Sequence, residues 1–82
     1  MLVYNQLRWR CRRGTQELDR LLLGFLENAY PRISPQMQQT FQDFLEMEDS
    51  CLQHYLLGDA IPERHDFQLI VSLMQSSDFA KT

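Results

Sequence analysis

The sequence predicts a small all-α protein, a compact single-domain bundle of about five short helices. Every stretch with a regular apolar pattern follows the 3.6-residue period of a helix, and none alternates with the period of a strand. Proline and glycine divide the chain into short segments joined by connections of roughly two to six residues. Its 82 residues suffice for one hydrophobic core, so we expect a single domain over residues 1–82.

The first two predicted helices meet at Gly14. A short helix over about residues 3–12 carries Tyr4, Leu7 and Cys11 on one face. Gly14 interrupts that pattern, and Thr15 is placed to cap the helix that follows. The second helix has the clearest amphipathic spacing in the chain, formed by Leu18, Leu21, Leu22, Phe25, Leu26 and Ala29.

The third and fourth helices are predicted from their start and stop residues. Pro31 ends the second helix, and Ser34 with the proline after it begins the third. Asp49 or Ser50 is expected to cap the fourth helix, and Gly58 to end it in the left-handed conformation. Their inward-facing residues are predicted to be Met37, Phe41, Phe44 and Leu45 in the third helix, and Leu52, Tyr55 and Leu56 in the fourth.

The fifth helix is predicted to open at the dipeptide Ile61-Pro62, because proline is favoured in the first helical turn. Its apolar face is formed by Phe67, Ile70, Val71 and Met74. Residues 76–82 follow no sustained pattern, so we expect a frayed C-terminal tail.

Charge is distributed unevenly along the chain. Residues 1–13 contain four arginines and no acid, a charge of +4, whereas the remainder sums to −7 and gives the net charge of −3. A nucleic-acid-binding domain would usually be basic overall, so this asymmetry favours an oriented contact with a protein. No apolar run approaches the roughly 20 residues of a membrane span, so no membrane insertion is expected.

Catalytic and metal sites are weakly indicated. Cys51 and His54 lie three residues apart and could supply two metal ligands, but Cys11, His65 or carboxylates would have to supply the others. We therefore favour a buried structural Cys51, a surface His54 and a Cys11 that fills the core. Two cysteines form no disulfide framework, and reduced, cytosol-like surroundings are the default expectation. No catalytic residue and no metal site is predicted.

The candidate site is the junction between the arginine-rich segment and the second helix. Arg13 and Glu17 lie four residues apart beside Gly14. They could form an ordinary surface ion pair, or they could join the nearby arginines as donors for carboxylates on a partner. Trp9 could likewise be a core aromatic or part of an interface. The predicted partner-binding residues are Arg8, Arg12, Arg13, Gly14 and Glu17.

The same stretch resembles a known family. The string Arg12-Arg13-Gly14-x-x-Glu17-Leu18-Asp19 is similar to the R-G-x-x-E signature of the succinate dehydrogenase flavinylation factors. The resemblance continues through Phe44-Leu45-Glu46-x-x-Asp49 and Leu52-x-x-Tyr55-Leu56, and covers about residues 8–75. One departure is Tyr55, which stands where many relatives have tryptophan; we expect this to change only the packing.

The resemblance implies a five-helix assembly chaperone and not an enzyme. Members of the family help to attach FAD covalently to a histidine of the flavoprotein subunit of succinate dehydrogenase and, in some bacteria, of fumarate reductase. Arg13, Gly14 and Glu17 would lie at the contact with that subunit, and Arg8 on the same surface. No tightly bound cofactor is expected, since the FAD belongs to the client.

The implied location is the bacterial cytoplasm, or the mitochondrial matrix in a eukaryote. A second function stays open: a small regulatory adaptor or antitoxin that sequesters a partner protein.

Overall fold

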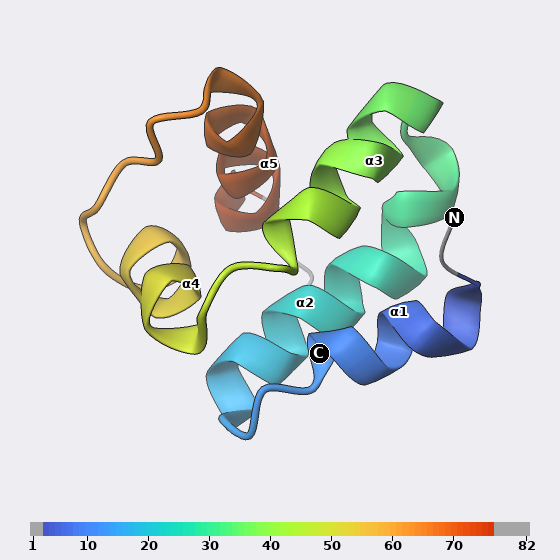
Figure 1. The fold of residues 1–82 in the computed structure, drawn as a ribbon, viewed down its shortest axis with the longest axis horizontal. Coiled ribbons are helices and arrows are strands. Elements are labelled where there is room, and N and C mark those ends of the chain that lie inside the picture. Colours follow the sequence, from blue (N-terminus) through green and yellow to red (C-terminus); the bar gives the residue numbers. More distant parts are fainter. Residues whose placement is uncertain (1–2, 77–82) are drawn as a thin grey trace.

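Five α-helices and one 3-10 turn make up residues 3–76, the part of the chain that the computed structural model describes (Figure 1). Within these residues there is no strand, so the all-α prediction is confirmed. The predicted frayed tail falls outside the described residues, except for Ser76, which ends the last helix. The elements are α1 (Tyr4–Cys11), α2 (Gln16–Asn28), η1 (Tyr30–Arg32), α3 (Pro35–Phe44), α4 (Asp49–Leu56) and α5 (His65–Ser76).

Helix α2 lies at the centre of the packing. Helix α1 runs along one side of α2, and α4 contacts α2 near the N-terminal end of α2 (Figure 1). Helix α3 packs against α5. Each helix turns an apolar stripe inward, as its amphipathic spacing requires. The resulting core consists of Leu7, Cys11, Leu18, Leu22, Phe25, Leu26, Phe41, Phe44, Leu45, Leu52, Leu56, Phe67, Ile70, Val71 and Met74.

Aromatic rings connect the helices across this core. The rings of Phe25 and Phe41 join α2 to α3 with their centroids 5.0 Å apart. Phe44 meets Phe67 edge-on at 5.3 Å and so joins α3 to α5. Pairs of this kind contribute about 0.5–1.5 kcal/mol beyond the area that they bury. The predicted apolar faces therefore form one continuous core, with one exception: Tyr4, predicted on the inward face of the first helix, is 44% exposed and lies outside the core.

Several predicted helix starts are confirmed by their caps. The hydroxyl oxygen of Thr15 accepts a hydrogen bond from the backbone N–H of Leu18 at 3.4 Å, and Ser34 accepts one from Met37 at 3.2 Å. Helix α2 ends at Asn28, and the chain then forms the turn η1, which contains Pro31 and was not predicted.

The predicted caps of α4 are wrong at both ends. Glu48 takes the N-cap position instead of Asp49 or Ser50, and its side chain makes no capping bond. Asp49 is the first helical residue, and its carboxylate is bonded to Arg13. Gly58 does not have a positive φ, so it is not a left-handed stop. A Cβ there would lie 3.0 Å from the carbonyl oxygen of His54, so close approach of the backbone explains this glycine.

The predicted start of α5 is also wrong. The helix begins at His65, three residues after Pro62. Pro62 is buried, and its carbonyl oxygen accepts a hydrogen bond from the side-chain amide of Gln68 at 2.8 Å. This bond links the proline to α5 from outside the helix, and residues 57–64 form the longest connection among the described residues.

Candidate functional site

One surface of the molecule carries the predicted site. We call it the cationic corner; it is formed by α1, the turn over residues 12–15 and the first turn of α2. Its exposed or half-exposed members are Arg8, Trp9, Arg10, Arg12, Gly14 and Glu17. The structure leaves four of the five predicted site residues exposed or half-exposed, and Arg8 and Arg12 line the same hollow, whereas most of the side chain of the fifth, Arg13, is buried.

Gly14 forms the sharp turn between the two helices. Its φ is +91°, in the left-handed region that residues with a side chain rarely adopt. A Cβ at this position would meet no heavy atom within 4 Å. Glycine is therefore required by the backbone angle and not by any neighbour inside the fold, and the bare peptide faces open space.

Arg13 points inward and ties the turn to the rest of the bundle. Its backbone N–H donates to a carboxylate oxygen of Asp19 at 2.6 Å. One terminal nitrogen of its guanidinium donates to the carbonyl oxygen of Leu45, and the other lies 3.3 Å from the Asp49 carboxylate. Only 17% of the side chain is exposed.

The surface ion pair considered between Arg13 and Glu17 is absent from the described residues. Glu17 is exposed and forms no ion pair with any residue between 3 and 76, because the guanidinium of Arg13 is turned toward Leu45 and Asp49. Four-residue spacing predicts such pairs when both side chains belong to one helix. Here Arg13 precedes α2, so the helical geometry does not apply.

The exposed arginines of α1 and of the turn after it differ in how their side chains are partnered. Arg8 forms an exposed ion pair of 3.3 Å with Glu27 of α2, an interaction that contributes about 0–1 kcal/mol. Within residues 3–76, neither Arg10 nor Arg12 has an ion pair or a side-chain hydrogen bond, and both are exposed. Their charges are therefore available to an external partner.

Trp9 is 75% exposed, so its interpretation as a core aromatic is wrong. It stands beside a shallow hollow of about 330 Å³ that is lined by Asn5, Arg8, Trp9 and Arg12. Indole and guanidinium groups are over-represented among the residues that dominate binding energies at protein interfaces. Their combination on one helix face is suited to contact with another protein.

The cysteines and histidines do not form a metal centre in the described part of the chain. Cys11 is fully buried, as predicted, and burial raises the pKa of its thiol to about 12 despite the nearby Arg13 and Arg8. Cys51 is half-buried where a buried residue was expected, and His54 is exposed. Across residues 3–76, no group of three or more potential ligands lies close enough together to hold a metal ion.

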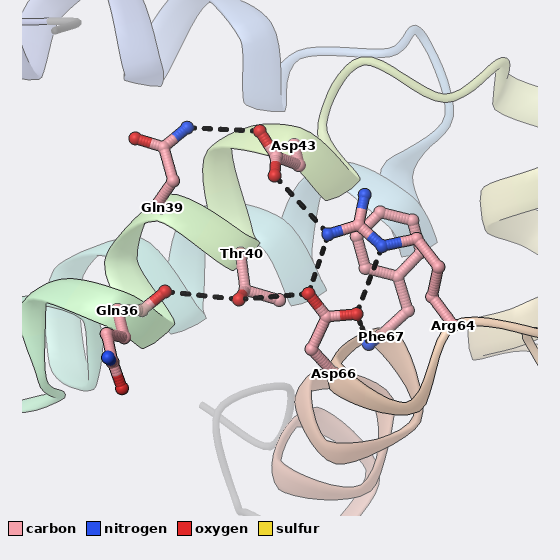
Figure 2. A network of polar contacts seen from close by, with 7 residues as sticks. All are labelled: Gln36, Gln39, Thr40, Asp43, Arg64, Asp66 and Phe67. Carbon is pink, nitrogen blue, oxygen red and sulfur yellow. Dashed lines mark hydrogen bonds and ion pairs between the residues drawn. The ribbon is translucent and has the colours of Figure 1, made fainter.

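A second polar cluster joins α3 to α5 and includes Arg64, directly before α5 (Figure 2). The Arg64 guanidinium donates to the Asp66 carboxylate at 2.6 Å and lies 3.4 Å from Asp43 of α3. It also lies over the ring of Phe67, 4.0 Å from the centroid. The bond from Arg64 lowers the pKa of the Asp66 carboxyl. Sequence reasoning missed this network, because its two acids belong to different helices and lie 23 residues apart in the chain.

Comparisons with known proteins identify a family and a set of relatives. Residues 5–78 match the family described as flavinator of succinate dehydrogenase. Proteins named FAD assembly factor SdhE are similar to the chain: that of Coxiella burnetii is 35% identical over 74 residues, covering 90% of each protein. That of Yersinia pestis is 33% identical, covering 93% of this chain and 86% of the relative. That of Legionella pneumophila is 35% identical, covering 90% and 92%. No solved structure matches the chain.

The chain therefore belongs to the succinate dehydrogenase flavinator family, as the resemblance indicated. None of the helices within residues 3–76 has the length and apolar character needed to cross a membrane.

Proposed function

We propose that this chain is an FAD assembly factor that binds the flavoprotein subunit of succinate dehydrogenase and promotes covalent attachment of FAD to that subunit. Membership of the family supports this proposal, as do the names of relatives that align over nearly the whole chain. The flavoprotein of fumarate reductase is a second proposed client, in which the same covalent attachment of FAD would be promoted. The relatives are bacterial, and we place the chain in the cytoplasm.

The cationic corner is the proposed contact with the flavoprotein. The observation that carries this assignment is the exposure of Arg10, Arg12 and Trp9 with no partner for the two charges among residues 3–76. An arginine fork can bind a carboxylate through two parallel hydrogen bonds. Gly14 adds exposed peptide that a partner backbone can approach closely, because no side chain covers it.

The chain would act as a chaperone and not as the catalyst. Covalent attachment joins a carbon of the flavin ring to a histidine nitrogen, and both groups belong to the client and its cofactor. A bundle docked on the flavoprotein can stabilise the arrangement of its domains in which the two groups meet. It does so to the extent that it binds that arrangement more tightly than the others.

A direct experiment tests the proposed function. The gene is deleted from its natural host, and covalent flavin is detected by the fluorescence of the flavoprotein band on a denaturing gel. We expect the band to lose fluorescence and to recover it with the wild-type gene, while a gene encoding Arg12→Glu restores it poorly. Unchanged fluorescence after deletion would contradict the proposal and would favour the adaptor or antitoxin that sequesters a partner.

A further inference from the structure

We infer that Arg13 is a positioning residue, an internal strut that holds the turn at Gly14 in place, and that Asp49 is its counter-ion. This inference rests on the proposed function, because it assigns roles within the proposed contact. It divides the R-G-x-x-E string in two. Gly14 and Glu17 face outward and can meet the client, whereas Arg13 acts through the backbone that it holds.

The contacts of Arg13 link segments that are far apart in the chain. Its guanidinium reaches Leu45, directly after α3, and Asp49, the first residue of α4. Two of the three sequence stretches that carry the family resemblance, residues 12–19 and 44–49, therefore meet at this one side chain. A single strut thereby fixes the turn that leads from α1 into α2 against the corner between α3 and α4.

The backbone of Arg13 completes the arrangement. Its N–H donates to Asp19, one turn into α2, while the hydroxyl of Thr15 caps the same helix. The turn is therefore bonded on both sides of Gly14, whose positive φ makes it the point where the chain changes direction. Any movement of this turn would reorient α1 and the arginines on its outer face.

The strut is better suited to fixing geometry than to adding stability. The Nε atom of Arg13 is buried and has no hydrogen-bond partner among residues 3–76. Removing a charged group from water and leaving one of its donors unpaired offsets much of what the ion pair contributes. The two terminal nitrogens, in contrast, reach one carbonyl and one carboxylate from a single rigid plane. Such a fork defines one position of the turn.

The test compares the full chain with Arg13→Gln, Asp49→Asn and the double variant. Arg64→Gln is the matched control, because it removes an arginine from the polar cluster between α3 and α5. Affinity for the purified flavoprotein subunit is measured by calorimetry, and amide hydrogen exchange is measured on each free chain. We expect Arg13→Gln to weaken binding about tenfold, the scale of one lost charged hydrogen-bonding group.

The pattern across variants decides the role. If Arg13 holds the turn, Asp49→Asn weakens binding severalfold, and the double variant binds no more weakly than Arg13→Gln alone. Amide hydrogen exchange at residues 12–15 becomes faster in each of these variants. Arg64→Gln leaves both binding and exchange at the turn unchanged. Additive losses, or weaker binding with unchanged exchange at the turn, would show that Arg13 and Asp49 touch the client directly and would overturn the inference.

Two further outcomes remain distinguishable. If the wild-type chain does not bind the flavoprotein, the proposed function fails, and the exchange measurement still decides whether Arg13 holds the turn. If Arg13→Gln does not fold, as circular dichroism would show, Asp49→Asn tests the strut alone, because its exposed side chain leaves the core intact. In that case unchanged exchange at residues 12–15 in Asp49→Asn would overturn the inference.

Discussion

Arg64 is held by two carboxylates and covers a phenylalanine ring, whereas the side chains of Arg10 and Arg12 form no ion pair or hydrogen bond with any residue between 3 and 76. The first arrangement joins α3 to α5 within the molecule. The second leaves positive charge exposed on α1 and on the turn that follows it, in a chain whose overall charge is negative. The comparison teaches that the same residue type serves the fold where acids from other helices reach it, and serves recognition where none does.

The two regions also rest on different supports. Beneath the cationic corner lie apolar groups, including Leu7 and the buried thiol of Cys11. The polar cluster around Arg64 is held by exposed ion pairs and by Thr40, which donates to Asp66 at 3.4 Å. Mutations and pH should therefore affect the two regions differently, and four predictions test this difference.

The largest loss of affinity is expected from Gly14→Arg. A long side chain on the exposed turn would block a partner backbone, so we expect affinity for the flavoprotein to fall at least about 100-fold, the scale of 2.7 kcal/mol. Circular dichroism should still show a folded helical protein, because no heavy atom lies within 4 Å of an added Cβ. The control is Gly14→Ala, which carries the same left-handed strain of about 1–2 kcal/mol without the bulk. Loss of helix in Gly14→Arg would mean that this glycine is only structural.

Alkaline pH should destabilise the core beneath the cationic corner. The pKa of the Cys11 thiol is raised from 9.0 to about 12, so the folded state holds a proton that the unfolded chain releases. Its contribution is fully present below pH 9 and is lost as pH rises toward 12, by up to about 1.4 kcal/mol per pH unit. Urea unfolding at several pH values should show that the free energy of unfolding falls less steeply with rising pH for Cys11→Val than for the wild type. Equal slopes for the two chains would contradict this account of Cys11.

Glu17→Ala should weaken binding to the flavoprotein with little change in stability. We expect the affinity to fall about fivefold, or roughly 1 kcal/mol. This is more than the few tenths of a kcal/mol that an exposed helical ion pair contributes. Calorimetric titration measures the affinity. The matched control is Glu63→Ala, which removes an exposed acid outside the cationic corner. Equal affinities for the two variants would remove Glu17 from the contact.

The smallest effect concerns the polar cluster in acid. The hydrogen bond from Arg64 lowers the pKa of the Asp66 carboxyl below the ordinary 3.8. That contribution is present above pH 3.8 and is lost as pH falls through the lower folded-state value. Arg64→Gln should therefore show a slightly smaller loss of stability between pH 5 and pH 3 than the wild type, measured by the midpoint of urea unfolding. A larger loss in the variant would mean that Asp66 draws its stabilisation from elsewhere.

The cationic corner was only partly predictable from the sequence. The clustering of arginines, the glycine turn and the Thr15 cap follow from neighbouring residues, so composition and spacing are sufficient to find them. The direction of each side chain is not local information. Arg13 was expected to face a partner and instead faces Leu45, because α3 and α4 bring a carbonyl and a carboxylate to that place.

The sequence by itself determined the helical class, the apolar faces of the five helices and the position of the sharp turn at Gly14. These features depend on residues a few positions apart, whose side chains share a face at the helical period. Only the tertiary structure decided that Arg13 points inward, that Asp49 does not cap its helix and that Arg64 joins α3 to α5. These contacts span 21 to 36 residues of chain, and a charged side chain takes whichever partner the packing brings within reach.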